Sequence, residues 1–236
     1  MRRLSTLLSA LLLLTFVLAA CRDDSDDGGE TPSVDEIVDS AVAAWDETET
    51  AHFTLEVEGT AYLDSDETII LRSAEGDAAR PDAVEADAKI SAGFLTVDIG
   101  LVFIGDEAYM TDLITGNWGP APDGFSYNPA VLFSDTEGLG PVLREMQGTE
   151  LVGQEEIDGT AAYHLRGTVA EELITELTAN TISGDPINVD VWFATDDYRA
   201  LQLVLGTPPD AEGEPTQWTI MLSDHGAPVT IEAPTS

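Results

Sequence analysis

One cysteine and three histidines are the residues in this chain of 236 that would most readily supply a nucleophile or a general base. A covalent hydrolase needs Ser or Cys within hydrogen-bond reach of a His. His52 and His164 occupy polar positions in alternating stretches and His225 lies in a turn-like run, so we expect all three to be exposed. No Gly-x-Ser-x-Gly motif is present in the sequence. We therefore predict no catalytic residue and no enzyme; the hydrolase alternative would require ester turnover that depends on one Ser or His.

Carboxylates are the most abundant polar groups, with 45 Asp and Glu against 9 Lys and Arg and a net charge of −36. Adjacent acids at residues 64–67, 155–156 and 196–197 could form an acid–base pair, but in so acidic a chain we expect them in solvated turns between strands. Residues 23–28 fit the first half of a calcium-binding loop, whose twelfth position is Val34 in place of Glu. The sequence contains no phosphate-binding or dinucleotide-binding loop motif. No metal and no cofactor are predicted.

The N-terminus is typical of an export signal. Residues 1–20 comprise a short basic stretch, an apolar run and small residues before Cys21. A transmembrane anchor is the alternative, but it would need about 18 or more apolar residues. Residues 18–21, Leu-Ala-Ala-Cys, resemble the bacterial lipobox, which implies that residues 1–20 are removed and that Cys21 receives lipid. The resemblance implies an exported protein, anchored to the outer face of the cell membrane by acyl chains on Cys21.

Composition divides the remaining chain into two parts. Residues 21–33 are predicted to form a flexible tether after the lipidated cysteine, because they are acidic and offer almost no apolar surface. Residues 34–236 show no break in composition and are predicted to form one domain. Removal of residues 1–20 deletes two arginines and brings the net charge to −38. This charge argues against nucleic acid as a partner. Because an acidic surface is also repelled by anionic lipid headgroups, we expect the lipid on Cys21 to provide the membrane attachment.

Helical periodicity is confined to three places. Ser33 and Glu36 have capping-box spacing, and the apolar residues after them recur every three or four positions as far as Trp45. This pattern predicts a helix with Trp45 packed in a core. A second helix is predicted at residues 139–146 and a third at residues 168–177, where Thr168 begins another capping-box pattern.

Elsewhere apolar and polar residues alternate, which is typical of strands with one buried face. The alternating stretches are residues 53–57, 84–90, 95–103, 108–110, 151–157, 161–167, 187–193, 201–205, 218–222 and 229–231. Links of hairpin length between them predict an antiparallel sheet and an α+β fold. With few helices to cover it, such a sheet closes on itself, pairs with another sheet or encloses a ligand. A filled core is the alternative to a ligand cavity.

Short motifs with a consistent order and spacing run through the mature chain. They are residues 51–55 (AHFTL), 75–77 (EGD), 80–83 (RPDA), 105–112 (GDEAYMTD), 116–118 (GNW), 127–130 (YNPA), 138–139 (GL), 163–167 (YHLRG), 191–195 (VWFAT) and 222–224 (LSD). Together with the lipobox they resemble the LppX/LprAFG family of bacterial envelope lipoproteins. The resemblance implies a half-barrel, in which a single curved antiparallel sheet has a few helices on its concave face and encloses an apolar cavity.

The resemblance also implies an acylated lipid or glycolipid as ligand and an export partner in the envelope. Burying acyl chains requires only contiguous apolar surface, which the strands supply. We select cavity candidates from the apolar positions of the central strands and the short helices. They are Val97, Ile99, Leu101, Phe103, Leu139, Leu143, Leu173, Leu177, Val189 and Val191.

The predicted function is therefore a membrane-anchored carrier that moves or presents acylated lipids in the cell envelope. The strong acidity favours a neutral or weakly charged cargo. Two alternatives stay open. A lipid-responsive sensor or regulator would bind a protein partner with an affinity that changes with lipid, and a structural lipoprotein with a filled core would co-purify with no lipid.

Overall fold

The computed structural model describes residues 31–64, 66–122, 129–208 and 215–235. The predicted signal, Cys21 with its lipobox, and most of the predicted tether lie outside these ranges. Residues Pro32–Ser236 pack as one unit.

Within the described residues, eleven strands form one open antiparallel sheet, as the alternating pattern predicted. The strands are β1 (Thr50–Glu58), β2 (Ile69–Ala79), β3 (Ala83–Ala92), β4 (Leu95–Ile104), β5 (Glu107–Thr111), β6 (Trp118–Pro120), β7 (Gln147–Ile157), β8 (Thr160–Val169), β9 (Ile187–Ala194), β10 (Ala200–Gly206) and β11 (Gln217–Ser223). Their order across the sheet is β6-β5-β4-β3-β2-β1-β11-β10-β9-β8-β7. Each half of the sheet is therefore a meander of hairpins, and β1 joins the two halves by pairing with β11.

The pairing of β1 with β11 also explains why the buried side chains share one face. Phe53 lies opposite Leu222, and Leu55 lies opposite Ile220. These side chains are all buried. Because side chains alternate along a strand, the residues between them face the other side and meet solvent.

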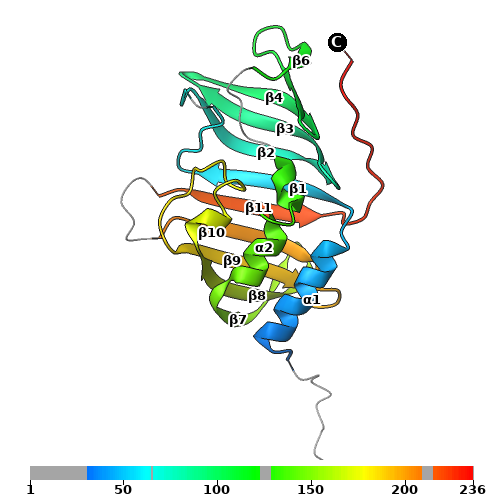
Figure 1. Cartoon of the computed structure of the whole chain (residues 1–236), viewed down its shortest axis with the longest axis vertical. Helices are drawn as coiled ribbons and strands as arrows, with labels where there is room; N and C mark the ends of the chain where they lie inside the picture. Colours follow the sequence, from blue (N-terminus) through cyan, green and yellow to red (C-terminus); the bar gives the residue numbers. More distant parts are fainter. Residues whose placement is uncertain (1–30, 65, 123–128, 209–214, 236) are drawn as a thin grey trace, which may run out of the picture. The chain divides into compact units, whose positions relative to one another are not determined.

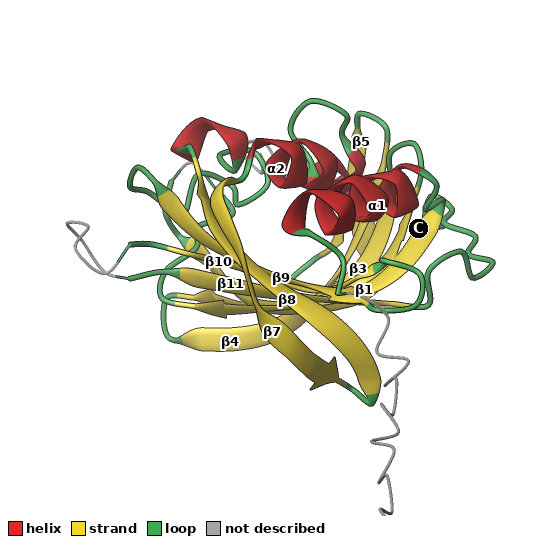
Figure 2. Cartoon of the chain, turned by 90° about the horizontal axis from the view of Figure 1, so that it is seen from below, coloured by secondary structure: helices red, strands yellow, loops and turns green. Residues whose placement is uncertain are grey.

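Two α-helices, α1 (Val34–Asp46) and α2 (Leu139–Glu145), are present in the described part of the chain, with two short 3₁₀ helices, η1 (Pro129–Phe133) and η2 (Glu171–Leu173). The sheet is curved, and α1 and α2 lie across its concave face (Figures 1 and 2). This arrangement confirms the predicted α+β half-barrel. No helix in the described ranges has the length and apolar character needed to span a membrane.

The start of α1 follows the capping-box prediction. The Ser33 hydroxyl accepts a hydrogen bond from the Glu36 backbone at 3.3 Å, and the Glu36 carboxylate accepts one from the Ser33 backbone at 2.8 Å. One stripe of the helix, which includes Ile37 and Trp45, is buried against the sheet and its loops. The Trp45 ring stacks on Phe133 of η1 with 5.1 Å between ring centroids.

The prediction of a third helix at residues 168–177 was wrong. Thr168 and Val169 are the last residues of β8 and pair with Asn188 and Ile187 of β9. The ladder therefore uses the residues that were expected to cap a helix. Only the single turn of η2 follows, and its N-cap, Ala170, makes no side-chain hydrogen bond.

Three strand assignments also differ from prediction. Residues 229–231 alternate in sequence but belong to no strand. β2 was missed because its alternation breaks at a register shift between Leu71 and Ser73 and again at Gly76. β6 was missed because it has only three residues, two of which are Gly119 and Pro120.

Candidate functional site

An apolar cavity lies on the concave side of the sheet. Its walls come from β1 to β4, from β11, from η1 and from two loops. The lining residues are Phe53, Leu55, Leu63, Leu71, Ala74, Ala78, Ala86, Ala88, Leu101, Pro129, Leu132, Leu177, Trp218 and Ile220. None of these fourteen side chains carries a charge, so the cavity offers hydrocarbon contact and excludes an ion that has no partner.

Small side chains on β2 and β3 create the floor of this cavity. Ala74 lies opposite Ala88, and Gly76 lies opposite Ala86. Gly76 has no room for a side chain, because a Cβ placed there would lie 2.1 Å from the Glu85 carbonyl oxygen. A strand pair built from alanine and glycine cannot fill the space that leucine or valine fills elsewhere in the sheet.

The roof of the cavity consists of η1 and the loop that carries Leu177. Arg80, at the end of β2, ties this roof to α1. Its guanidinium donates to the carbonyl oxygens of Thr48 at 2.8 Å, Phe133 at 3.0 Å and Trp45 at 3.2 Å. It also lies 4.8 Å from the centroid of the Phe133 ring. One largely buried arginine thus connects β2, the end of α1 and η1.

The cavity is narrow in this structure, with a volume of about 40 Å³. That volume is room for about three water molecules at ~10–15 Å³ each. A long acyl chain therefore requires the roof to move away from the floor. The roof elements are a single 3₁₀ helix and irregular loops, which have fewer backbone hydrogen bonds to break than a sheet or a long helix.

Two of the ten predicted cavity residues, Leu101 and Leu177, line this cavity. Ile99 and Phe103 are buried on the same face of β4, immediately beside Leu101. Val97, further along that face, lines a separate surface hollow next to the β5–β6 loop.

The other five candidates belong to the core or pack against it, and they do not line this cavity. Val189 and Val191 of β9 and Leu139 and Leu143 of α2 are almost completely buried, and Leu173 is partly buried against them. Sequence reasoning favoured large apolar residues and missed the alanines. Ala86 and Ala88 alternate with exposed acids, a pattern that predicts a strand but does not distinguish small buried side chains from large ones.

A second feature that sequence reasoning missed is the burial of His164. Its side chain is on the polar side of β8, as predicted, but only 4% of the residue is exposed, so the expectation of an exposed histidine was wrong. The imidazole stacks on Trp192 at 4.1 Å, and this ring covers it. Nδ1 lies 2.9 Å from Glu155 and Nε2 lies 2.6 Å from Asp190. Both ring nitrogens therefore lie within hydrogen-bond distance of a carboxylate oxygen.

Glu155 is part of the same cluster and is not in a turn. The pair Glu155-Glu156 lies within β7, which corrects the expectation of a loop between strands. Hydrogen bonds from the Trp192 indole at 2.8 Å and from His164 lower the pKa of the Glu155 carboxyl. This cluster ties three neighbouring strands together on the outer face of the sheet.

The remaining histidines also make specific contacts. His52 is partly exposed, and its Nδ1 lies 2.9 Å from Asp77 on the neighbouring strand. His225 lies in the predicted turn, where Nε2 donates to the Ala200 carbonyl at 2.9 Å and Nδ1 is buried without a partner. Burial lowers the pKa of the His225 imidazole. Among the described residues, no group of three or more His, Cys, Asp or Glu side chains has an arrangement that could hold a metal ion.

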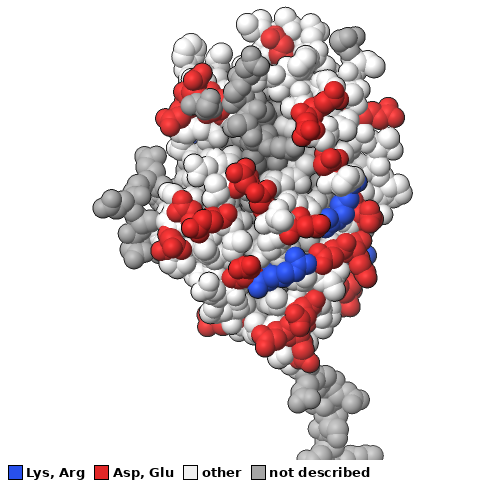
Figure 3. Space-filling model, viewed as in Figure 1, with Lys and Arg blue, Asp and Glu red and all other residues white. Residues whose placement is uncertain are grey.

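Acidic side chains are spread over the face that carries the helices (Figure 3). The few basic side chains on this face are engaged in local contacts, such as the 2.7 Å pair between Arg144 of α2 and Asp46 of α1. The charge therefore lies on the outside of the molecule, while the cavity walls are uncharged.

Comparison with known proteins places this chain in a family. The model of the LppX_LprAFG lipoprotein family matches residues 34–231. The chain belongs to this family of lipoproteins, as its motifs suggested. It is 25% identical to the lipoarabinomannan carrier protein LprG of Mycolicibacterium smegmatis over 96% of this chain and 94% of that protein.

Two solved structures share the fold. The crystal structure of LprF from Mycobacterium bovis aligns with a TM-score of 0.67 at 19% identity, over 87% of this chain and all of that one. The crystal structure of LppX from Mycobacterium tuberculosis aligns with a TM-score of 0.59 at 14% identity, over 85% of this chain and all of that one. The shared fold extends across the whole length of both crystallised chains.

Proposed function

We propose that this protein is a non-enzymatic lipid carrier of the bacterial cell envelope, held at the outer face of the membrane by lipid on Cys21. The observation that carries the proposal is the wholly uncharged cavity between the sheet and the η1 roof. Its walls offer a ligand only hydrocarbon contact, which suits acyl chains and gives no group to activate a bond. The family supports the same class of ligand, since its relative LprG is named as a lipoarabinomannan carrier.

The energetics favour carriage over permanent binding. Each buried methylene contributes about 0.8 kcal/mol relative to water, but little relative to the interior of a bilayer. A cavity of this kind holds an acyl chain firmly while the protein crosses water and releases it to another apolar phase. Opening of the roof then controls the rate of exchange.

The net charge of the protein restricts the charge that the headgroup of a bound lipid can carry. The mature chain has a net charge of −38, so a headgroup at the cavity mouth meets a strongly negative surface. We infer that the cargo is an acylated lipid or glycolipid with a neutral or weakly charged headgroup. A lipid with several phosphates would be disfavoured by the same surface that keeps the domain soluble.

Lipid extraction from the purified protein tests this proposal. The chain from Arg22 onward, produced in a bacterial host without the acyl anchor, is purified without detergent, and its organic extract is examined by mass spectrometry. We expect acylated lipids in near-equimolar amount, with neutral headgroups in excess over polyanionic ones. A protein that carries no lipid, and takes up none from detergent solution, would exclude the carrier function; mainly polyanionic lipids would exclude the proposed headgroup class.

A further inference from the structure

One corner of the molecule exposes large apolar side chains in a way that the cavity does not explain. Phe94 is 98% exposed at the β3–β4 turn, and Leu95 beside it is 56% exposed. Ile114 is 93% exposed in the β5–β6 loop, and Leu113 is 42% exposed. We call these four residues the apolar corner. Among the described residues, Val152 is the one other large apolar side chain with comparable exposure.

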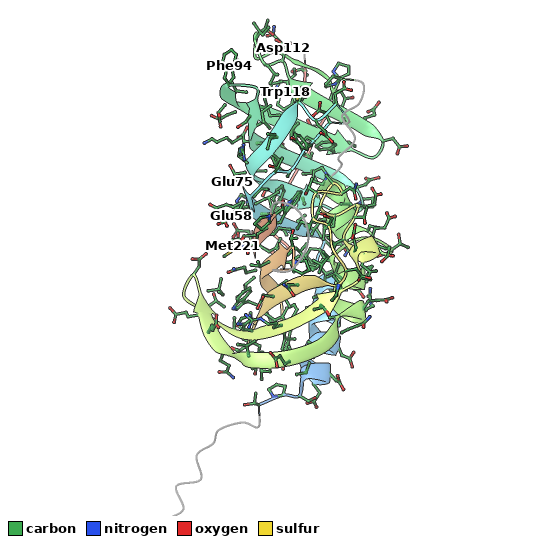
Figure 4. The ribbon with its side chains drawn as sticks, turned by 90° about the vertical axis from the view of Figure 1, so that its left-hand side faces the viewer. Glu58, Glu75, Phe94, Asp112, Trp118 and Met221 are labelled. Atoms are coloured by element: carbon green, nitrogen blue, oxygen red, sulfur yellow. The ribbon has the colours of Figure 1, made fainter. Side chains whose placement is uncertain are left out.

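The backbone of both loops holds these side chains outward. The β3–β4 turn has two residues, Gly93 at φ 60° and Phe94, and Phe94 projects from the end of the hairpin (Figure 4). In the second loop the Asp112 carboxylate accepts hydrogen bonds from the backbone of Ile114 at 3.1 Å and of Thr115 at 2.7 Å. These bonds form a tight turn that places Ile114 at its tip. The exposure is therefore built into the two loops.

The corner is also free of charge in a very acidic chain. About one residue in five is Asp or Glu, yet residues 90–97 and 113–122 contain no charged residue at all. The carboxylate at the base of the second loop, Asp112, is turned toward the backbone amides, and those hydrogen bonds lower its pKa. Asp112 is the one carboxylate that lines the hollow at this corner, and it lies at the base of its loop, so the side chains at the loop tips can enter a medium of low polarity ahead of it.

A surface hollow lies at the corner, on the same side of β4 as the cavity. Leu95, Val97, Met110 and Ile114 line this hollow together with other residues of the β5–β6 loop. Val97 begins a continuous apolar row on one face of β4, and the row runs through Ile99 to Leu101, which lines the cavity. The row places apolar side chains in succession from the corner to the cavity wall, with Ile99 buried between the two spaces.

We propose that the apolar corner inserts into the surface of a lipid bilayer, and that acyl chains pass between bilayer and cavity beside it. This inference rests on the proposed carrier function and names the part of the protein that contacts the membrane during loading. A bilayer is the occupant that fits best, because the side chains stand singly on two loop tips and can enter fluid hydrocarbon without a matching shape. A neutral bilayer surface also avoids repulsion from the acidic body.

Vesicle binding and lipid transfer test the proposal together. The chain from Arg22 onward contains the whole Pro32–Ser236 unit and lacks the acyl anchor. It is mixed with neutral phosphatidylcholine vesicles that contain a fluorescent diacylglycerol, and both flotation with the vesicles and the initial rate of lipid transfer are measured. In the double variant Phe94→Ser/Ile114→Ser we expect both to fall at least tenfold. Thermal unfolding should be unchanged, because the altered side chains are fully exposed.

The matched control is Val152→Ser, which removes an exposed valine from β7, away from the corner. This variant should bind vesicles and transfer lipid like the unaltered chain. Lipid capacity is measured separately by supplying the same diacylglycerol in detergent that is then removed, and the double variant should keep full capacity.

The two proposals can fail separately. The corner proposal is overturned if the unaltered chain does not float with vesicles, or if the double variant floats equally well. If the unaltered chain takes up no lipid from detergent, the carrier function fails, while the flotation result still decides the role of the corner.

Discussion

At the scale of single residues, the cavity depends on what β2 and β3 lack. The central concave positions of these strands hold alanines and Gly76, whereas β9 holds the larger side chains Val189 and Val191. The alternating pattern predicted which face each side chain takes. It could not distinguish a strand that fills the core from one that leaves space, because that difference depends on the side chains opposite.

Filling the floor should therefore abolish lipid uptake. In Ala88→Phe a large ring enters the space below η1, and overpacking costs about 1–3 kcal/mol in the free energy of unfolding. We expect a folded protein that takes up less than a tenth of the normal amount of fluorescent lipid. Asp87→Phe, on the exposed face of the same strand, is the control and should bind lipid normally. Normal uptake by Ala88→Phe would contradict a cavity at this position.

His225 should make the protein less stable in mild acid. Burial, with a smaller effect of Arg199, keeps the pKa of its imidazole below the ordinary value of 6.5, although the hydrogen bond to Ala200 and the nearby Asp197 and Asp224 act in the opposite direction. Below pH 6.5 the unfolded chain binds a proton that the folded protein does not bind. The contribution of His225 to the free energy of unfolding therefore falls as the pH falls.

Denaturant unfolding at pH 7.5 and pH 5.5 measures this effect. The unaltered protein should lose more stability between the two pH values than His225→Gln, in which this proton uptake is removed. The other histidines are common to both proteins, so their contribution cancels in the comparison. Equal losses would show that His225 does not contribute.

At the scale of elements, the local sequence predicted the helix start and the hairpin that are stabilised by contacts within a few residues. The capping box of Ser33 and Glu36 gave the start of α1, and the Asp158-Gly159 turn gave the β7–β8 hairpin. The same capping pattern at Thr168 failed, because pairing with β9 satisfies its backbone groups instead. A tertiary partner decided that element, and no local pattern reports such a partner.

Among the contacts between elements, we expect those of Arg80 to contribute most to the free energy of unfolding. Arg80→Ala removes donors from three carbonyl groups at the end of α1 and in η1, and it also removes the packing on Phe133. We expect the free energy of unfolding to fall by about 2–4 kcal/mol, and the roof of the cavity to exchange backbone amide hydrogens faster.

Arg72→Ala is the matched control, since Arg72 bonds to Gly59 and Ser91 at the exposed surface of the same strand. It should change stability by less than about 1 kcal/mol. Similar losses in the two variants would mean that the Arg80 bonds do not hold the roof.

At the scale of the whole molecule, the joint between β1 and β11 holds two meanders in one sheet. Seven residue pairs, from His52–Ser223 to Glu58–Gln217, make this joint. Hairpin-length links predicted an antiparallel meander. The pairing of β1 with β11, which come from opposite ends of the described chain, has no local signal and was not predicted.

Loss of β11 should abolish the fold. A chain that ends before residue 215 leaves one edge of β1 and one edge of β10 unpaired. It also removes Ile220 and Trp218, which lie opposite Leu55 and Leu205. We expect no cooperative thermal transition in circular dichroism. A chain that ends after residue 226 removes only the irregular C-terminal segment and should retain a cooperative transition. A cooperative transition in the shorter chain would show that the meanders fold independently.

The position of β11 in the sequence also orders the folding of the sheet. Its partners β1 and β10 belong to different halves, so the sheet is complete only when β11 bridges them. Pairing of β1 with β11 over such a long sequence separation is slow. Formation of this joint is therefore the step that makes the two halves one cooperative unit.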